Sequence, residues 1–145
     1  MKFVIQRVLE SNVKVDDVEV GRIGKGFMVL IGIKQGDTKK EADYLVKKLL
    51  NLRVFEDEKG KMNKDIKDQK GELLLISQFT LYANCEKGNR PSFIEAEKPE
   101  KAKKLYEYII EQCKNQIDKV ESGIFGADMK VYLINDGPVT IILEK

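Results

Sequence analysis

The sequence predicts a single α+β domain in which two amphipathic helices pack on one mostly antiparallel, barrel-like β-sheet. Several short runs of apolar residues have the length of strands. Only two segments show the three-and-four spacing of an amphipathic helix. The 145 residues contain no linker, internal repeat or low-complexity segment, so one domain is expected over residues 1–145.

The first third of the chain is expected to form strands. Residues 3–8 are apolar with polar interruptions. Residues 13–20 alternate between apolar and polar side chains around the pair Asp16-Asp17, which favours a turn and predicts a hairpin. Residues 27–33 form a nearly continuous apolar run, which is typical of a strand buried on both faces.

Two helices are predicted from their caps and apolar faces. Thr38 and Glu41 have the spacing of a capping box, and the apolar face that follows comprises Ala42, Leu45, Val46, Leu49 and Leu50. Pro99 suits the first turn of a second helix. The apolar face of that helix comprises Ala102, Leu105, Tyr106, Ile109, Ile110 and Cys113.

The remaining apolar runs predict further strands. Residues 52–55 are short and branched, which favours a strand, whereas residues 57–71 are polar and indicate loop or edge structure. The run that begins at Glu72 continues as far as Tyr82. Near the end of the chain, two strands are expected at residues 131–134 and 139–143.

The composition excludes several classes of protein. Lys and Arg total 26 and Asp and Glu total 24, so the net charge of +2 excludes a histone-like nucleic-acid binder. Because there is no histidine, a Ser-His-Asp triad, a histidine general base and a His-ligated zinc ion are impossible within the chain. Cys85 and Cys113 lack the spacing of a zinc or redox motif. We therefore expect no metal and no cofactor.

The same absences predict where the protein acts. Free thiols suit a reducing compartment. No run approaches the roughly 20 apolar residues of a membrane helix, and charges interrupt the apolar residues at the start as they would not in a signal peptide. A cytoplasmic protein without a membrane partner is expected.

Residues 77–80, Ser-Gln-Phe-Thr, interrupt an apolar run with polar side chains. One interpretation is a strand that leaves the core and turns these side chains to solvent. The other is a strand end in a pocket, where Gln78, Thr80 and backbone N–H groups form hydrogen bonds with a ligand. The pattern alone leaves both open.

Residues 135–140, Asn-Asp-Gly-Pro-Val-Thr, also have two interpretations. Asp-Gly is a strong turn pair, which favours a tight turn between two strands. Gly-Pro also leaves two carbonyls without a bulky neighbouring side chain. If the Gly137-Pro138 peptide is cis, these carbonyls can form a rigid acceptor surface.

The segments 77–82 and 135–140 resemble the signature pair of the D-aminoacyl-tRNA deacylases. The resemblance extends over essentially the whole chain, because other segments of the family appear in the same order. These are Val4-Ile5-Gln6-Arg7-Val8, Asn51-Leu52-Arg53-Val54-Phe55, Gly60-Lys61-Met62-Asn63, Arg90-Pro91-Ser92-Phe93 and Phe125-Gly126-Ala127-Asp128-Met129.

The resemblance implies an editing hydrolase that cleaves the ester between a D-amino acid and the 3′ end of tRNA, and also glycine mischarged on tRNA(Ala). It implies a homodimer in which the cis Gly137-Pro138 peptide of one subunit enters the partner's site and rejects L-amino acids. The catalytic pocket would comprise Ser77, Gln78, Phe79 and Thr80. The substrate-binding residues would be Arg7, which orients the gate, Phe125 and Met129 near the adenosine, Asn135, Gly137 and Pro138.

This chemistry is compatible with a chain that has no histidine. An aminoacyl ester is already activated, and the neighbouring 2′-hydroxyl of the tRNA can assist if the pocket holds the ester and donates hydrogen bonds to the oxyanion. Two alternatives remain open at this point. One is a non-catalytic RNA- or nucleotide-binding module, and the other is a small-molecule esterase that depends on Thr80 or Cys85.

Overall fold

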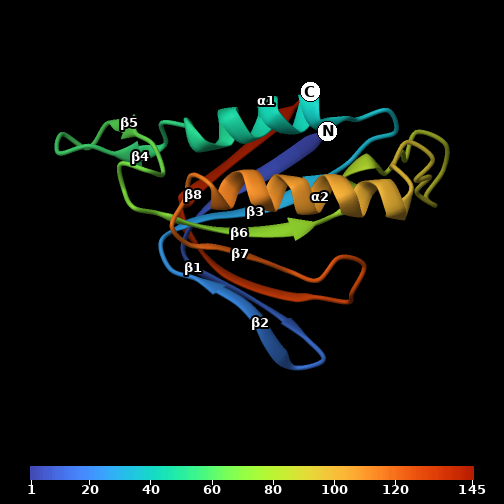
Figure 1. Ribbon diagram of the computed structural model, residues 1–145, viewed down its shortest axis with the longest axis horizontal. Helices are drawn as coiled ribbons and strands as arrows, with labels where there is room; N and C mark the ends of the chain where they lie inside the picture. Colours follow the sequence, from blue (N-terminus) through green and yellow to red (C-terminus); the bar gives the residue numbers. More distant parts are fainter.

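A computed structural model describes residues 1–145 as one α+β domain, which confirms the predicted fold class (Figure 1). Six strands form the main sheet: β1 (Lys2–Val15), β2 (Val18–Ile23), β3 (Gly26–Gly32), β6 (Glu72–Ser77), β7 (Val120–Ser122) and β8 (Lys130–Glu144). A separate hairpin consists of β4 (Phe55–Glu56) and β5 (Met62–Lys64). The helices are α1 (Lys39–Leu50), α2 (Pro99–Lys114) and the short 3₁₀ helix η1 (Phe79–Tyr82).

The main sheet is mixed and nearly closed. Its order is β2-β1-β3-β6-β7, and β8 also pairs with the long strand β1. The pairs that β1 makes are antiparallel, whereas β3–β6 and β6–β7 are parallel because α1 and α2 lie in the connections between them. The two ends of the sheet approach each other at Gly21 of β2, where a Cβ would lie 3.2 Å from the Ser122 carbonyl oxygen of β7.

Both helices pack side by side across one face of the sheet, as Figure 1 shows. The capping box of Thr38 and Glu41 is present at the start of α1, and Pro99 begins α2, so both predicted helix starts are confirmed. Of the predicted apolar faces, only Ile110 is partly exposed. Most of the core, a cluster of 24 buried residues, lies between the helices and the sheet.

The central strands are buried on both faces, as the continuous apolar run predicts. Val29 of β3 and Leu75 of β6 contribute to the core under the helices. Their neighbours Met28, Leu74 and Ile76 belong to a second cluster inside the curved sheet. This burial on both sides fixes the end of β6, where the first candidate segment begins.

The strand predicted at residues 52–55 is wrong in its position. Only Phe55 belongs to a strand, which continues to Glu56. The two preceding residues are engaged elsewhere, because the Arg53 side chain donates to the Asn63 carbonyl and the Val54 carbonyl accepts from Arg7. The β4–β5 hairpin itself projects beyond the end of α1 (Figure 1).

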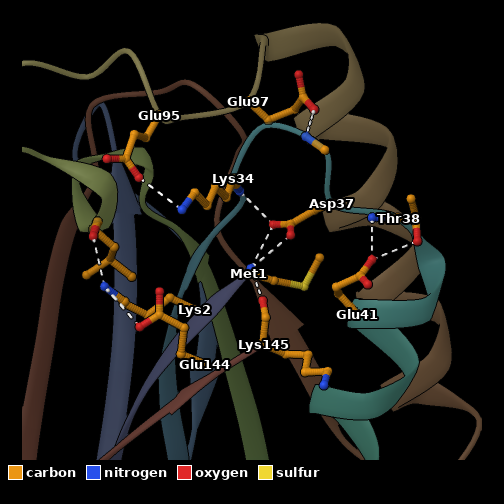
Figure 2. Close-up of polar contacts among 12 residues, drawn as sticks. Met1, Lys2, Lys34, Asp37, Thr38, Glu41, Glu95, Glu97, Glu144 and Lys145 are labelled. Carbon is orange, nitrogen blue, oxygen red and sulfur yellow. Dashed lines mark hydrogen bonds and ion pairs between the residues drawn. The ribbon is translucent and has the colours of Figure 1, made fainter.

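The first and last strands are tied together at one end of the sheet. The Met1 amino group donates to Asp37 at 2.9 Å and to the Lys145 carbonyl at 2.6 Å, and the Lys145 N–H donates to the Met1 carbonyl at 3.0 Å (Figure 2). Asp37 also accepts from the Lys34 N–H, which fixes the loop before α1.

Neither helix is long and apolar enough to span a membrane.

Candidate active site

The first candidate segment begins where β6 leaves the core. Four of the six β6 residues are buried, and the strand ends at Ser77, which lies opposite Ile31 of β3. The Gln78 N–H donates to the Ile31 carbonyl at 2.8 Å, after which β3 offers no further partner. The chain therefore turns into η1 and does not continue as the strand that the sequence pattern indicates.

The side chains around η1 face solvent in the single chain. Phe79 is 57% exposed and packs edge-to-face on Phe93, with ring centroids 5.1 Å apart. The Gln78 side-chain amide donates to the Thr80 hydroxyl, so these two polar groups hold each other in place. The chain has clefts of about 470 and 240 Å³, and neither is lined by Gln78, Phe79 or Thr80.

The start of η1 also offers backbone donors. The first intrahelical hydrogen bond runs from the Leu81 N–H to the Gln78 carbonyl at 3.4 Å. The N–H groups of Phe79 and Thr80 therefore precede the first turn, where helical N–H groups have no intrahelical acceptor. Two adjacent donors at the end of a rigid strand can bind a carbonyl oxygen or an oxyanion.

Phe125 and Met129 lie beside the same end of β6. The Leu75 carbonyl accepts hydrogen bonds from the Tyr106 hydroxyl at 2.7 Å and from the Gly123 N–H at 3.1 Å. The Tyr106 ring packs on Phe125 with centroids 5.9 Å apart. Met129 packs closely on Gly123, because a Cβ built on Gly123 would lie 2.3 Å from the Met129 sulfur.

The second candidate segment is a bulge in β8. The predicted strands at 131–134 and 139–143 are parts of this one strand, so the alternative of a tight turn between two strands is wrong. Gln6 of β1 pairs with Thr140, whereas Val8 pairs with Asn135, so five steps along β8 correspond to two along β1. The extra residues carry the Gly137-Pro138 peptide outward, and both residues are exposed.

The Gly137-Pro138 peptide bond is cis, which confirms that prediction. Gly137 has φ +131°, and a Cβ at this position would lie 2.9 Å from Val139 Cγ2 and 3.0 Å from the Val139 nitrogen. Only glycine accommodates both the positive φ and the close contact.

The Arg7 side chain anchors this bulge through contacts with Asp136. Its side chain is 7% exposed; Nε donates to the Asp136 carbonyl at 3.0 Å and lies 3.3 Å from the Asp136 carboxylate. Nη1 donates to the Val54 carbonyl at 2.5 Å. The resemblance assigned Arg7 to this place, but sequence reasoning missed Asp136 and Val54. The only feature of the sequence that could have identified Asp136 is its position beside Gly137. A backbone carbonyl such as that of Val54 cannot be recognised from a sequence.

The two halves of the predicted site do not meet within one chain. Ser77 at the end of β6 lies level with Ile31 of β3, whereas Arg7 lies level with Phe27. Four strand residues correspond to about 13 Å along the sheet. In addition, β1 and β3 lie between β8 and β6. The structure therefore places Ser77, Gln78, Phe79 and Thr80 together at the end of β6, and Arg7, Asn135, Gly137 and Pro138 together at the bulge. Phe125 and Met129 belong to the segment after β7 that borders β6, and they pack against the two different core clusters.

Ser77, Gln78, Phe79 and Thr80 include no ionisable side chain, and the carboxylate of the bulge, Asp136, is paired with Arg7. Burial raises the pKa of Tyr106 to about 12 and that of the Cys113 thiol to about 12, so both remain protonated. Cys113 lies in the core and Cys85 is exposed. No cluster of three or more Cys, Asp or Glu side chains could hold a metal ion. The arrangement can bind and orient an ester, but its side chains offer no strong base.

Comparison with known proteins shows the family of the chain. The family model described as D-Tyr-tRNA(Tyr) deacylase matches residues 4–144. The D-aminoacyl-tRNA deacylase of Clostridium novyi (strain NT) is 58% identical over 144 residues, which cover 99% of this chain and 97% of that protein. The D-aminoacyl-tRNA deacylase of Thermosipho melanesiensis is 53% identical over 145 residues with the same coverage.

Solved structures share the fold. The structure titled c-Myc DNA Unwinding Element Binding Protein superposes with a TM-score of 0.95 at 45% identity, covering 100% of this chain and 99% of that one. A probable eukaryotic D-amino acid tRNA deacylase superposes with a TM-score of 0.82 at 16% identity, covering 98% and 97%, and shows the fold alone. By sequence along its whole length, the chain belongs to the family of D-aminoacyl-tRNA deacylases, hydrolases that act on the aminoacyl-tRNA ester bond.

Proposed function

We propose that the protein hydrolyses D-aminoacyl-tRNA, and glycine mischarged on tRNA(Ala), in a site that two copies of the chain build together. One copy supplies the segment at the end of β6, and the other supplies the Gly137-Pro138 bulge. The observation that carries this proposal is the separation of the two halves within one chain. Measured along the strands, the exposed bulge is displaced by about 13 Å from Ser77.

The outer face of β1 and β8 supports a second copy as the missing partner. Tyr132, Ile134 and Ile142 of β8 are 53%, 51% and 62% exposed, which is unusual for large apolar side chains gathered on one strand. A hollow of about 470 Å³ lies over this face between residues 10–12 and 131–134. A two-fold axis through this face would bury both copies of the apolar surface and point each bulge toward the other subunit.

In this mechanism the pocket positions the ester and donates hydrogen bonds to it. The N–H groups of Phe79 and Thr80 donate to the ester carbonyl as it becomes an oxyanion, and one such donor is worth about 10²–10³ in rate. Gln78 fixes the Thr80 hydroxyl beside the ester. Phe125 and Met129 flank the adenosine. The 2′-hydroxyl of that adenosine, already next to the scissile bond, assists the attack of water or the departure of the 3′-oxygen.

The Gly137-Pro138 bulge provides selectivity by exclusion. Its exposed carbonyls occupy the space that the side chain of an L-amino acid would need, and a rigid backbone held by Arg7 does not yield to it. A D-amino acid directs its side chain elsewhere, and glycine has none. Because charged tRNA is the substrate, we place the protein in the cytoplasm.

The decisive experiment is deacylation of matched D- and L-aminoacyl-tRNA by the purified protein. We expect rapid release of the D-amino acid and of glycine, and no release of the L-amino acid above the uncatalysed rate. A non-catalytic nucleic-acid-binding module would bind the tRNA and release neither. An esterase that uses Thr80 or Cys85 would instead form an acyl-enzyme, which mass spectrometry would detect.

A further inference from the structure

A second cleft, of about 240 Å³, begins where η1 ends. Leu81 and Tyr82 of η1 line it, together with Lys2 at the start of β1 and Lys34 in the loop after β3. We call it the lysine cleft. Its remaining wall comprises Ala83, Asn84, Cys85 and three carboxylates, Glu86, Glu95 and Glu144. It lies directly next to the candidate active site, because Phe79 and Thr80 belong to the same four-residue helix as Leu81 and Tyr82.

Two ammonium groups converge in this cleft. Lys2 Nζ lies 5.1 Å and Lys34 Nζ lies 5.9 Å from the centroid of the Tyr82 ring. Both lysines come from the tightly fixed end of the sheet, where Met1 and Asp37 hold the neighbouring backbone (Figure 2). The fold therefore fixes the backbone from which both lysines extend.

Each ammonium is paired with one carboxylate that it can release. Lys2 lies 3.5 Å from Glu144, and Lys34 lies 3.1 Å from Glu95 (Figure 2). The side chains of Glu144 and Glu95 are 52% and 48% exposed, so they can swing into water at little cost. A ligand with its own negative charge can take their place between the two lysines.

A third donor in the cleft has no partner. Tyr82 is 94% buried, and its hydroxyl oxygen has no accessible surface and no hydrogen-bond partner of good geometry. Glu144 lies beside it, so the hydroxyl can reach a ligand only once Glu144 has swung into water. Buried hydroxyls without a partner are rare in folded proteins. Burial, together with the nearby carboxylates, raises the pKa of the Tyr82 phenol well above its usual value, so this group stays protonated and can donate.

We propose that the lysine cleft binds a backbone phosphate of the tRNA acceptor strand, just before the adenosine whose ester is cleaved. The proposal rests on the proposed function and names a further contact of the same substrate. Two ammonium groups and a phenol are donors, and donors of this kind select an anionic phosphodiester oxygen. A 3₁₀ helix rises about 2.0 Å per residue, so Tyr82 lies only about 4 Å along η1 from Thr80, and the cleft is within reach of a strand whose end is held at Thr80.

The test compares two substrates that differ in their phosphates. D-aminoacyl-tRNA carries the acceptor strand, whereas D-aminoacyl-adenosine has the same ester and no phosphate. For the double variant Lys2→Gln/Lys34→Gln we expect the KM for tRNA to rise about tenfold with kcat little changed, and the slope of log KM against log salt to fall by about one. Hydrolysis of D-aminoacyl-adenosine should be unchanged.

Two further single variants test the roles of the Glu144 carboxylate and of the Tyr82 hydroxyl. Glu144→Gln should lower the KM for tRNA, because it removes the carboxylate that competes for Lys2. Tyr82→Phe should raise that KM a few-fold without lowering the melting temperature, because the lost hydroxyl has no partner in the free protein. Lys103→Gln is the matched control: Lys103 lies on α2, is 58% exposed and also has a carboxylate partner, Glu107 at 3.9 Å. It should leave the KM and the salt slope unchanged.

Each outcome decides the proposal. An unchanged KM and salt slope in the double variant would overturn it, as would an equal loss on both substrates, which would place the lysines at the reacting end or in folding. If the wild-type protein hydrolyses neither substrate, the proposed function fails, and binding of uncharged tRNA then tests the cleft alone. A double variant that binds uncharged tRNA as tightly as wild type at each salt concentration would refute the phosphate contact.

Discussion

The two halves of the candidate site are supported by the fold in different ways. The segment at residues 77–80 follows β6, which is hydrogen-bonded on both sides and buried on both faces. The bulge at residues 135–140 belongs to β8, in which no residue is fully buried, and its main anchor is one buried arginine. The core therefore fixes the segment after β6, which we call the pocket half after its proposed role. The bulge, which we call the gate half after its proposed role, depends on Arg7 and on whatever covers β8.

This difference predicts which half is sensitive to which change. Damage to the gate should affect selectivity and assembly, while the pocket half should tolerate loss of single side chains because its donors are backbone groups. The following experiments test this contrast, beginning with the largest expected effect.

The first experiment changes the substrate. A tRNA that ends in 2′-deoxyadenosine and carries the D-amino acid on its 3′-hydroxyl should bind nearly as well as the normal one. Its cleavage should be slower by about 10²–10⁴-fold, the usual contribution of a positioned proton-transfer group. Single-turnover deacylation and binding should be measured together. Equal cleavage of both tRNAs would mean that the protein supplies the assisting group and that the pocket half does more than hold the ester.

The second experiment removes the anchor of the gate. Arg7→Ala leaves the Asp136 carboxylate and the Asp136 and Val54 carbonyls without their partner, so we expect a loss of about 3 kcal/mol in the free energy of unfolding. A displaced gate should also lower kcat/KM for D-aminoacyl-tRNA by about 10²-fold. Hydrolysis of L-aminoacyl-tRNA should become detectable. Denaturant unfolding and the two deacylation assays provide these measurements.

Arg22 supplies the control for this change. It is half-exposed and pairs with Glu19 on the surface of β2. Arg22→Ala should cost less than about 1 kcal/mol and leave both deacylation rates unchanged. If Arg7→Ala behaved like Arg22→Ala, the gate would not depend on its arginine and the contrast between the halves would fail.

The third experiment separates the two copies. Ile134→Asp places a charge in the apolar face of β8, and sedimentation should show a species near the 16.6 kDa of one chain in place of the dimer that we propose for the wild-type protein. Activity should fall with the dimer while the far-ultraviolet circular dichroism is retained. Val18→Asp changes a side chain that is similarly exposed, at 64%, on β2, and should leave both properties unchanged. A fully active monomer would contradict the shared site.

The smallest effects are expected in the pocket half. Thr80→Ala removes the hydroxyl that accepts from Gln78 but keeps the backbone N–H, so kcat should fall only about fivefold, the value of one neutral hydrogen bond. Cys85 lies outside this half, in the wall of the lysine cleft, and is exposed; Cys85→Ser should stay within a factor of about two, because it replaces the thiol with a hydroxyl of similar size. A fall to the uncatalysed rate in either variant, with the fold intact, would identify that side chain as a nucleophile.

Local patterns in the sequence were enough to predict the fold class, both helices and the central strands. Their apolar periodicity and caps are local properties, and burial of one face follows from them whatever the neighbours are. The sequence also identified the two segments that depart from regular strands, because Gln78 and Pro138 each conflict with a simple buried strand. The resemblance placed Arg7 beside the gate, and the structure shows the contact.

The positions of those segments in space depend on contacts between distant parts of the chain. The strand at residues 52–55 was displaced because the Val54 carbonyl accepts from Arg7, 47 residues away, and no local pattern encodes such a contact. The expected turn at residues 135–138 is a bulge because β1 is long enough to pair with β8 on both sides of it. The lysine cleft combines residues 2, 34, 82 and 144, which come together only when the first and last strands pair. Register and long-range pairing depend on which strands become neighbours, and that is decided by the burial of the whole sheet.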